Sequence, residues 1–317
     1  MTRAQKTYGQ VALLMAGILA ASILLTLLVS GGRPAASGNK QVVTSFYPMT
    51  VAALNLTDGV EGVEVVGLTG STTGCLHDYQ LSPDNRITLS SAFLLVLNGA
   101  GAESFLDGVL DEMPDLPIID TSAGIPLLAT GETEPHEAED GHQHSLHNEH
   151  IWTSPDRYAK QVENLRDGLC RYDPEHAEQY RQNAAAYLEE IHAIGEQLRQ
   201  AAAALPIRTC VIFHDSLAYL AQDWGLEVVV SLSMGEEAGV SAEDLAEAER
   251  QAAAAGEILL LYDSQYPMEY AYIANSADNR ATLTLNTAVS GPVSRTAWLD
   301  AMRYNLDQLR QLGGTRS

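Results

Sequence analysis

The 317-residue sequence is poor in basic side chains: 18 lysines and arginines stand against 41 aspartates and glutamates, a formal net charge of −23. A chain this acidic cannot hold a phosphate backbone by charge, so we predict no nucleic-acid partner. The only lysines are Lys6, Lys40 and Lys160. Few lysines are therefore available to form a Schiff base with a substrate or to bind a phosphate group. An acidic surface instead raises the local concentration of cations.

Cysteines are few, and two common hydrolase motifs are missing. Cys75, Cys170 and Cys210 are widely spaced and no C-x-x-C pair occurs, which excludes a thiolate zinc knuckle and a thioredoxin-type redox motif. The sequence allows one disulfide between two of these cysteines but does not say which two. The sequence contains no H-E-x-x-H and no G-x-S-x-G, so these two signatures of a hydrolytic site are absent.

The rest of the composition is typical of a globular protein. Hydrophobic residues make up 46% of the chain and charged residues 19%, which excludes wholesale disorder. The length suits two ordinary domains, because chains divide at about 150 residues per domain.

The N-terminus carries an uncharged apolar run at residues 11–29, preceded by two basic residues. At about 1.5 Å per residue this run matches the hydrocarbon core of a bilayer. It is either an uncleaved transmembrane anchor or a signal peptide whose cleavage site includes Ala35–Ala36. No cysteine lies near its end to carry a lipid. We therefore predict residues 1–40 as an anchor or signal segment plus linker. The body is then extracytoplasmic: membrane-associated if anchored, secreted or periplasmic if cleaved.

Strand and helix patterns alternate after this linker. A helix pattern at residues 48–56 follows the first strand, and continuous apolar runs such as Ala92–Asn98 suit strands that are buried on both faces. The alternation predicts parallel sheets covered by helices. The predicted strands are Val42–Phe46, Val63–Leu68, Ala92–Asn98 and Leu116–Ile119 in the first half, and Cys210–Phe213, Glu227–Leu232, Glu257–Tyr262 and Ala281–Leu285 in the second.

The two halves repeat one plan on either side of a long helix. The segments that begin at Val42 and Cys210 both read strand, turn, helix, glycine, strand, which suggests two related lobes. Between them, residues 173–206 open on Asp-Pro, a good N-cap and first helical residue, and continue as one helix pattern. The alternative is two helices broken at Gly195.

Three of the nine histidines, His77, His150 and His214, lie where a strand pattern gives way to a loop or helix. Ligands gather at the carboxyl ends of the strands in parallel sheets. Three neutral imidazoles that meet there would bind a borderline metal such as Zn²⁺. His176 and His192 lie on the long helix pattern and are expected to be solvated.

Residues 131–149 form a polar, acidic insert without apolar periodicity, which predicts a loop. Its histidines have spacings typical of loose metal binding; they are His136, His142, His144 and His147. A flexible loop loses entropy when it chelates an ion, so its affinity should be weaker than that of a preformed site. A solvated loop without a metal role is the alternative.

Several ordered blocks resemble the zinc/manganese solute-binding receptors of ABC importers (the ZnuA/TroA type), over about residues 42–312. The blocks are SFYP from Ser45, GCLHDYQLSPDNRITLSSAFLLVLNGAGAESFL from Gly74, the His-rich insert followed by HIWTSP from His150, DPEHAEQYRQNAAAYLEEI from Asp173, and FHDSLAYLAQDWGL from Phe213.

The resemblance implies an α/β fold of two lobes, each a mostly parallel sheet flanked by helices. One long rigid helix joins the lobes, and the metal site lies in the interlobe cleft with His77, His150 and His214 as ligands. We accordingly predict an N-terminal lobe at 41–172, a linking helix at 173–206 and a C-terminal lobe at 207–317.

Two positions depart from the family pattern and leave the fourth ligand open. Asn286 stands where a late strand-end carboxylate is expected, and Leu76 stands where some zinc members have a glutamate. The fourth position is then water, an insert histidine or Asp263. Loss of the carboxylate favours zinc over manganese, which prefers oxygen ligands.

The leading hypothesis is a monomeric, non-enzymatic receptor that captures Zn²⁺ and delivers it to an ABC permease driven by a cytoplasmic ATPase. A manganese or iron receptor and a surface adhesin are alternatives of the same fold. An enzyme is a further alternative, because three histidines with an open position also describe a hydrolytic zinc site, with Asp78, Asp215 or Glu149 as base.

Overall fold

The computed structural model describes residues 39–71, 76, 79–129, 147–232, 246, 249–251, 254, 256–265 and 280–315. The chain divides into two units, Met1–Asn39 and Lys40–Ser317, and the second is the body considered below. The predicted anchor or signal segment lies outside the described residues, as do Cys75, His77, Asp78, His136, His142 and His144. Within the described ranges, no helix is both long and apolar enough to span a bilayer.

Four strands from the first half form a parallel sheet in the order β2-β1-β3-β4. They are β1 (Lys40–Thr44), β2 (Val63–Gly67), β3 (Leu94–Leu97) and β4 (Ile118–Asp120), connected by α2 (Tyr47–Leu56), α3 (Pro83–Ser91) and α4 (Asp107–Leu110). Leu94 and Val96 enter one apolar cluster, whereas Leu95 enters another. Both faces of β3 are therefore covered, as its continuous apolar run predicted.

The second half repeats this topology in a parallel sheet of order β6-β5-β7-β8. Its strands are β5 (Thr209–Ile212), β6 (Glu227–Ser231), β7 (Ile258–Asp263) and β8 (Arg280–Leu285). In both sheets the first strand lies between the second and the third. The prediction of two α/β lobes with parallel sheets is confirmed.

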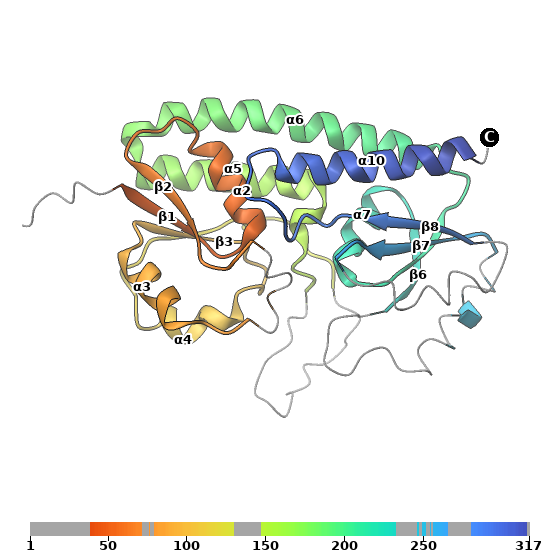
Figure 1. Cartoon of the computed structure of the whole chain (residues 1–317), viewed down its shortest axis with the longest axis horizontal. Coiled ribbons are helices and arrows are strands. Elements are labelled where there is room, and N and C mark those ends of the chain that lie inside the picture. The colour runs from red at the N-terminus through yellow and green to blue at the C-terminus, as the bar shows by residue number, and fades with distance from the viewer. Residues whose placement is uncertain are drawn as a thin grey trace, which may run out of the picture. The chain divides into compact units, whose positions relative to one another are not determined.

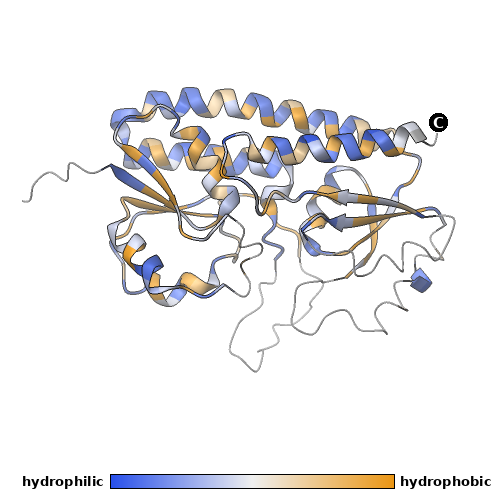
Figure 2. Ribbon diagram, in the orientation of Figure 1, coloured by the Kyte–Doolittle hydropathy of each residue, from blue (hydrophilic) through white to orange (hydrophobic). Residues whose placement is uncertain are grey.

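Long helices run along both sheets (Figure 1). The predicted linking helix is α6 (Ala177–Ala203), which follows the 3₁₀ turn η3 (Pro174–His176) and packs against α5 (Pro155–Tyr172) and α10 (Ala297–Thr315). Figure 2 shows hydrophobic and hydrophilic residues interspersed along α6. The buried residues recur at every third or fourth position, among them Tyr180, Ala184, Tyr187, Ile191, Ile194, Leu198 and Ala202. This spacing is the pattern of a helix with one face in the core.

Helix α6 continues through Gly195, so the alternative of two broken helices is wrong. A Cβ atom on Gly195 would lie 2.9 Å from the Cβ of Pro155, the first residue of α5. The glycine therefore permits a close approach of the two helices. The expectation of a single linking helix also missed α5, which packs beside α6.

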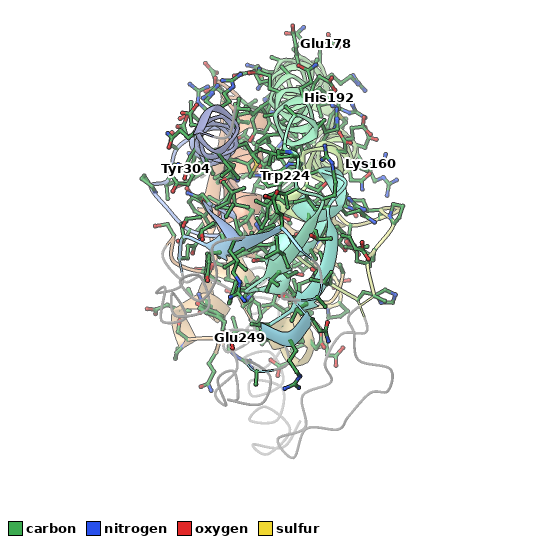
Figure 3. All side chains as sticks on the ribbon, turned by 90° about the vertical axis from the view of Figure 1, so that its right-hand side faces the viewer. Lys160, Glu178, His192, Trp224, Glu249 and Tyr304 are labelled. Carbon is green, nitrogen blue, oxygen red and sulfur yellow. The ribbon has the colours of Figure 1, made fainter. Side chains whose placement is uncertain are left out.

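The junction between α5 and α6 is tied to the first strand through Asp173. Its buried carboxylate accepts hydrogen bonds from Lys40 Nζ at 2.7 Å and the Tyr180 hydroxyl at 2.8 Å, and His176 Nδ1 lies 2.7 Å away. Burial raises the pKa of this carboxyl, but these three partners outweigh it and lower the pKa. His176 is therefore only partly solvated, with 28% of its side chain exposed, whereas His192 is exposed on α6 (Figure 3).

Two indole groups and a phenol join the lobes. Trp152 Nε1 donates to the Thr287 carbonyl at 2.9 Å, and Trp298 Nε1, on α10, donates to the Trp152 carbonyl at 2.9 Å. The Tyr47 hydroxyl on α2 donates to the Pro292 carbonyl at 2.9 Å. Both tryptophans are buried in an apolar cluster that contains residues of both sheets.

Two of the three cysteines are free thiols, so no disulfide joins Cys170 to Cys210. Cys170 Sγ donates to the Ala177 carbonyl at 3.4 Å. Burial within β5 raises the pKa of Cys210 to about 12, which makes it an inert core residue.

Candidate metal centre

His150 lies in a segment that is held at both ends. Upstream, an antiparallel bridge between Ala129 and His147 closes the base of the insert. Downstream, the 3₁₀ turn η2 (Ile151–Thr153) leads into α5, for which Ser154 is the N-cap. Between these anchors the side chain of His150 is only 1% exposed.

His214 follows the carboxyl end of β5, where the chain leaves the sheet. It caps the 3₁₀ turn η4 (Asp215–Leu217), which runs into α7 (Ala218–Asp223), and its Nδ1 accepts a hydrogen bond from the Ser216 N–H at 3.0 Å. The residue is 5% exposed. This position is the strand end at which ligands gather in parallel sheets.

The structure brings His150 and His214 together. Their ring centroids are 5.2 Å apart in an edge-to-face arrangement. Asp215 Oδ1 lies 3.6 Å from His150 Nδ1 and 3.2 Å from His214 Nδ1. One ligand atom from each of the three residues lies within 4.8 Å of the others, a spacing that could hold a metal ion. Sequence reasoning considered Asp215 only as a base in the hydrolase alternative, not as a ligand.

Hydrogen bonds assign a tautomer to each neutral imidazole. His150 Nδ1 faces Asn148 Oδ1 at 3.0 Å, and an amide oxygen only accepts, so Nδ1 carries the proton and the lone pair is on Nε2. His214 Nδ1 accepts from Ser216, so the neutral ring carries its proton on Nε2. Ligation through His214 Nε2 therefore requires the proton to move to Nδ1 and the Ser216 N–H to find another acceptor, whereas ligation through Nδ1 requires the loss of the bond from Ser216.

Asp263, a predicted fourth or supporting group, lies beside this group at the end of β7. Its buried carboxylate accepts from the Gln265 N–H at 3.0 Å and the Thr287 hydroxyl at 2.8 Å, and lies 3.4 Å from Ser216 Oγ. Burial raises the pKa of Asp263, although these hydrogen bonds and the two imidazoles lower it. Because Ser216 also bonds His214, Asp263 is placed to support the imidazole.

The remaining predicted site residues fall in three places. Asn286 is engaged in a turn, where its Oδ1 accepts from the Ala288 N–H at 2.8 Å. His147 is exposed at the base of the insert. His77 and the other insert histidines lie outside the described residues, so their roles as ligands stay predictions.

Comparisons with known proteins support a metal-binding family. The ZnuA family model, "Zinc-uptake complex component A periplasmic", matches residues 42–312. The iron-binding protein YfeA of Yersinia pestis is 31% identical over 66% of this chain and 64% of its own length. The zinc-binding lipoprotein AdcA of Streptococcus pneumoniae is 27% identical over 93% of this chain and 60% of its own length. The chain thus spans less than two thirds of the length of these relatives.

Solved structures share the fold. The SBP FpvC from Pseudomonas aeruginosa in complex with Ni²⁺ aligns with a TM-score of 0.74 at 21% identity, covering 88% of this chain and 98% of that chain. A crystal structure of ZnuA aligns with a TM-score of 0.66 at 22% identity, covering 87% and 98%. The family match over most of the chain confirms the resemblance: the chain belongs to the ZnuA family.

Proposed function

We propose that this protein captures Zn²⁺ outside the cytoplasm and delivers it to an ABC import permease. The observation that carries the proposal is the group of His150, His214 and Asp215, which converge although two of them are distant from the third along the chain. Family membership supports a metal-binding receptor. The choice of zinc and the identity of the ligands are our proposal.

The donor set suits zinc. Imidazole nitrogens and carboxylate oxygens bind Zn²⁺ at about 2.0–2.2 Å, in tetrahedral sites of four ligands. We assign the fourth position to His77, the remaining ligand that the family resemblance implies, whose neighbour Leu76 is buried. Three nitrogens and one oxygen would then surround the ion, and Asp263 would support His214 from behind.

A manganese or iron receptor is the second candidate, and the carboxylates near the imidazoles favour it. Besides Asp215, the buried Glu149 places its Oε1 3.9 Å from His150 Nε2. Oxygen ligands suit manganese better than zinc. The relative YfeA is named as an iron-binding protein, which also supports an iron receptor.

The proposal extends to partners and location. The permease and its ATPase would receive the ion from a monomeric, non-catalytic receptor, held outside the cytoplasm by residues 1–40 as an anchor or exported by them as a signal. The domain boundaries proposed with it are 41–172, 173–206 and 207–317.

Elemental analysis and titration calorimetry of the full chain test the proposal. We expect bound zinc after purification without chelator. We also expect the affinity for Zn²⁺ to fall by more than ~100-fold in His150→Ala, His214→Ala and Asp215→Ala, because loss of a ligand should weaken binding more than loss of a residue that only hydrogen-bonds a ligand. The exposed His192→Ala is the matched control and should bind as wild type does. Tight binding that persists in all three site variants would contradict the assignment. Competition between Zn²⁺, Mn²⁺ and Fe²⁺ without oxygen separates the two candidates.

A further inference from the structure

The two backbone carbonyls directly before His150 are bound from opposite lobes. The Asn148 carbonyl accepts a hydrogen bond from the Tyr219 hydroxyl at 2.6 Å, and Tyr219 lies on α7 in the second lobe. The next carbonyl, that of Glu149, accepts from Asn98 Nδ2 at 3.0 Å, and Asn98 follows β3 in the first lobe. Tyr219 and Asn98 are both fully buried.

Each of these two donors is itself held in place. The side-chain oxygen of Asn98 accepts from Gln161 Nε2 at 2.9 Å. The Tyr219 hydroxyl also accepts from the Leu128 N–H at 3.0 Å, at the other side of the insert's base. The guanidinium carbon of Arg157 lies 4.5 Å from the centroid of the Tyr219 ring. Neither donor can therefore swing away without breaking further contacts.

Asn148 connects these two carbonyls to the candidate metal centre, because its side chain contacts both His150 and Asp215. Its Oδ1 accepts from the His150 backbone N–H at 2.9 Å and faces Nδ1 of the same residue at 3.0 Å. Its Nδ2 donates to the Asp215 carbonyl at 2.8 Å. A displacement of residues 148–149 would therefore turn the imidazole of His150 and shift Asp215 with it.

We infer that Tyr219 and Asn98 are positioning residues, through which both lobes set the orientation of His150 and so the affinity for the metal. The inference rests on the proposed function, because it assumes that His150 is a ligand. Hydrogen-bond partners that orient ligating histidines typically contribute about 10–100-fold to metal affinity. Tyr219 acts through one further residue, Asn148, so we expect an effect at the lower end of this range.

The test compares Tyr219→Phe and Asn98→Ala with Tyr180→Phe in the full chain. Tyr180→Phe is the matched control, because it removes a buried tyrosine hydroxyl that donates to Asp173 at 2.8 Å on the α5–α6 junction. We expect Zn²⁺ affinity to fall about 10-fold in the first two variants and to stay unchanged in the control. The visible absorption of bound Co²⁺, which reports ligand number and geometry, should change in the first two variants alone.

The outcomes separate this inference from the proposed function. Wild-type Zn²⁺ affinity and Co²⁺ spectra in both Tyr219→Phe and Asn98→Ala would overturn the inference and leave the zinc receptor standing. An equal loss of affinity in Tyr180→Phe would also overturn it, because general destabilisation would then explain the effect. A wild-type chain that binds neither ion would overturn both.

Discussion

Replacing Gly195 by alanine sets helix propensity against packing. In an isolated helix this change gains about 1 kcal/mol. In α6, however, the new Cβ would meet Pro155 Cβ at 2.9 Å and Cγ at 3.6 Å. Pro155 starts α5 directly after its buried N-cap, Ser154, so it cannot move without α5. Overpacking of this kind costs about 1–3 kcal/mol, so we expect a net loss of about 1 kcal/mol in the free energy of unfolding.

Thermal or urea unfolding of the full chain measures this difference. A loss of about 1 kcal/mol lowers the midpoint of thermal unfolding by roughly 2 °C in a protein of this size. Gly313→Ala on α10 is the matched control, because its Cβ would lie 3.9 Å from Leu205 Cδ2, an ordinary contact. It should be neutral or stabilise the chain by up to ~1 kcal/mol. A Gly195→Ala protein more stable than wild type would refute the close-approach explanation.

Three further predictions concern pH, the α5–α6 junction and the insert. Burial raises the pKa of Glu103 to about 7, above its value in the unfolded chain. The free energy of unfolding should therefore fall by up to about 3 kcal/mol as the pH rises from 4.5 to 7. Denaturation of Glu103→Gln at several pH values should lack this contribution to the pH dependence. Asp173→Asn should lower the free energy of unfolding by about 2 kcal/mol at pH 7. Its difference from wild type should become smaller in acid, where the wild-type carboxylate is protonated, and denaturation at pH 3 and pH 7 measures both values. A chain whose residues 131–145 are replaced by a short linker, with the Ala129–His147 bridge kept, should retain its tight Zn²⁺ site in calorimetry; a large loss would place the insert in the site.

The central strands were predictable because strands covered on both faces must be apolar throughout. The run at residues 257–262 is an example, and the observed β7, shifted by one residue, is buried along its whole length. His150 and His214 were singled out because both lie at boundaries of ordered elements: His150 directly precedes the turn that leads into α5, and His214 follows β5. Asp215 was not considered as a candidate ligand because a carboxylate beside a histidine in a turn looks solvated in sequence. Its approach to His150 depends on a contact between distant segments.

Other features depend on tertiary packing that no local pattern carries. Gly195 looks like a helix breaker until its contact with Pro155 is known. His176 looks fully solvated until its contact with the buried carboxylate of Asp173 is known. The helix α5 is different, because its apolar positions, such as Tyr158, Val162, Leu165 and Leu169, already follow a helical spacing. That signal was present in the sequence and could have been used.

The indole contacts of Trp152 and Trp298 bear on how the molecule unfolds. Each donor and its acceptor come from different halves of the chain. A chain divided after residue 206 would have to bury these N–H groups without acceptors, at about 1–3 kcal/mol each, or expose two large rings to water. The two sheets are separate hydrogen-bonded structures, yet the halves that carry them should melt in a single cooperative transition, and neither should persist alone.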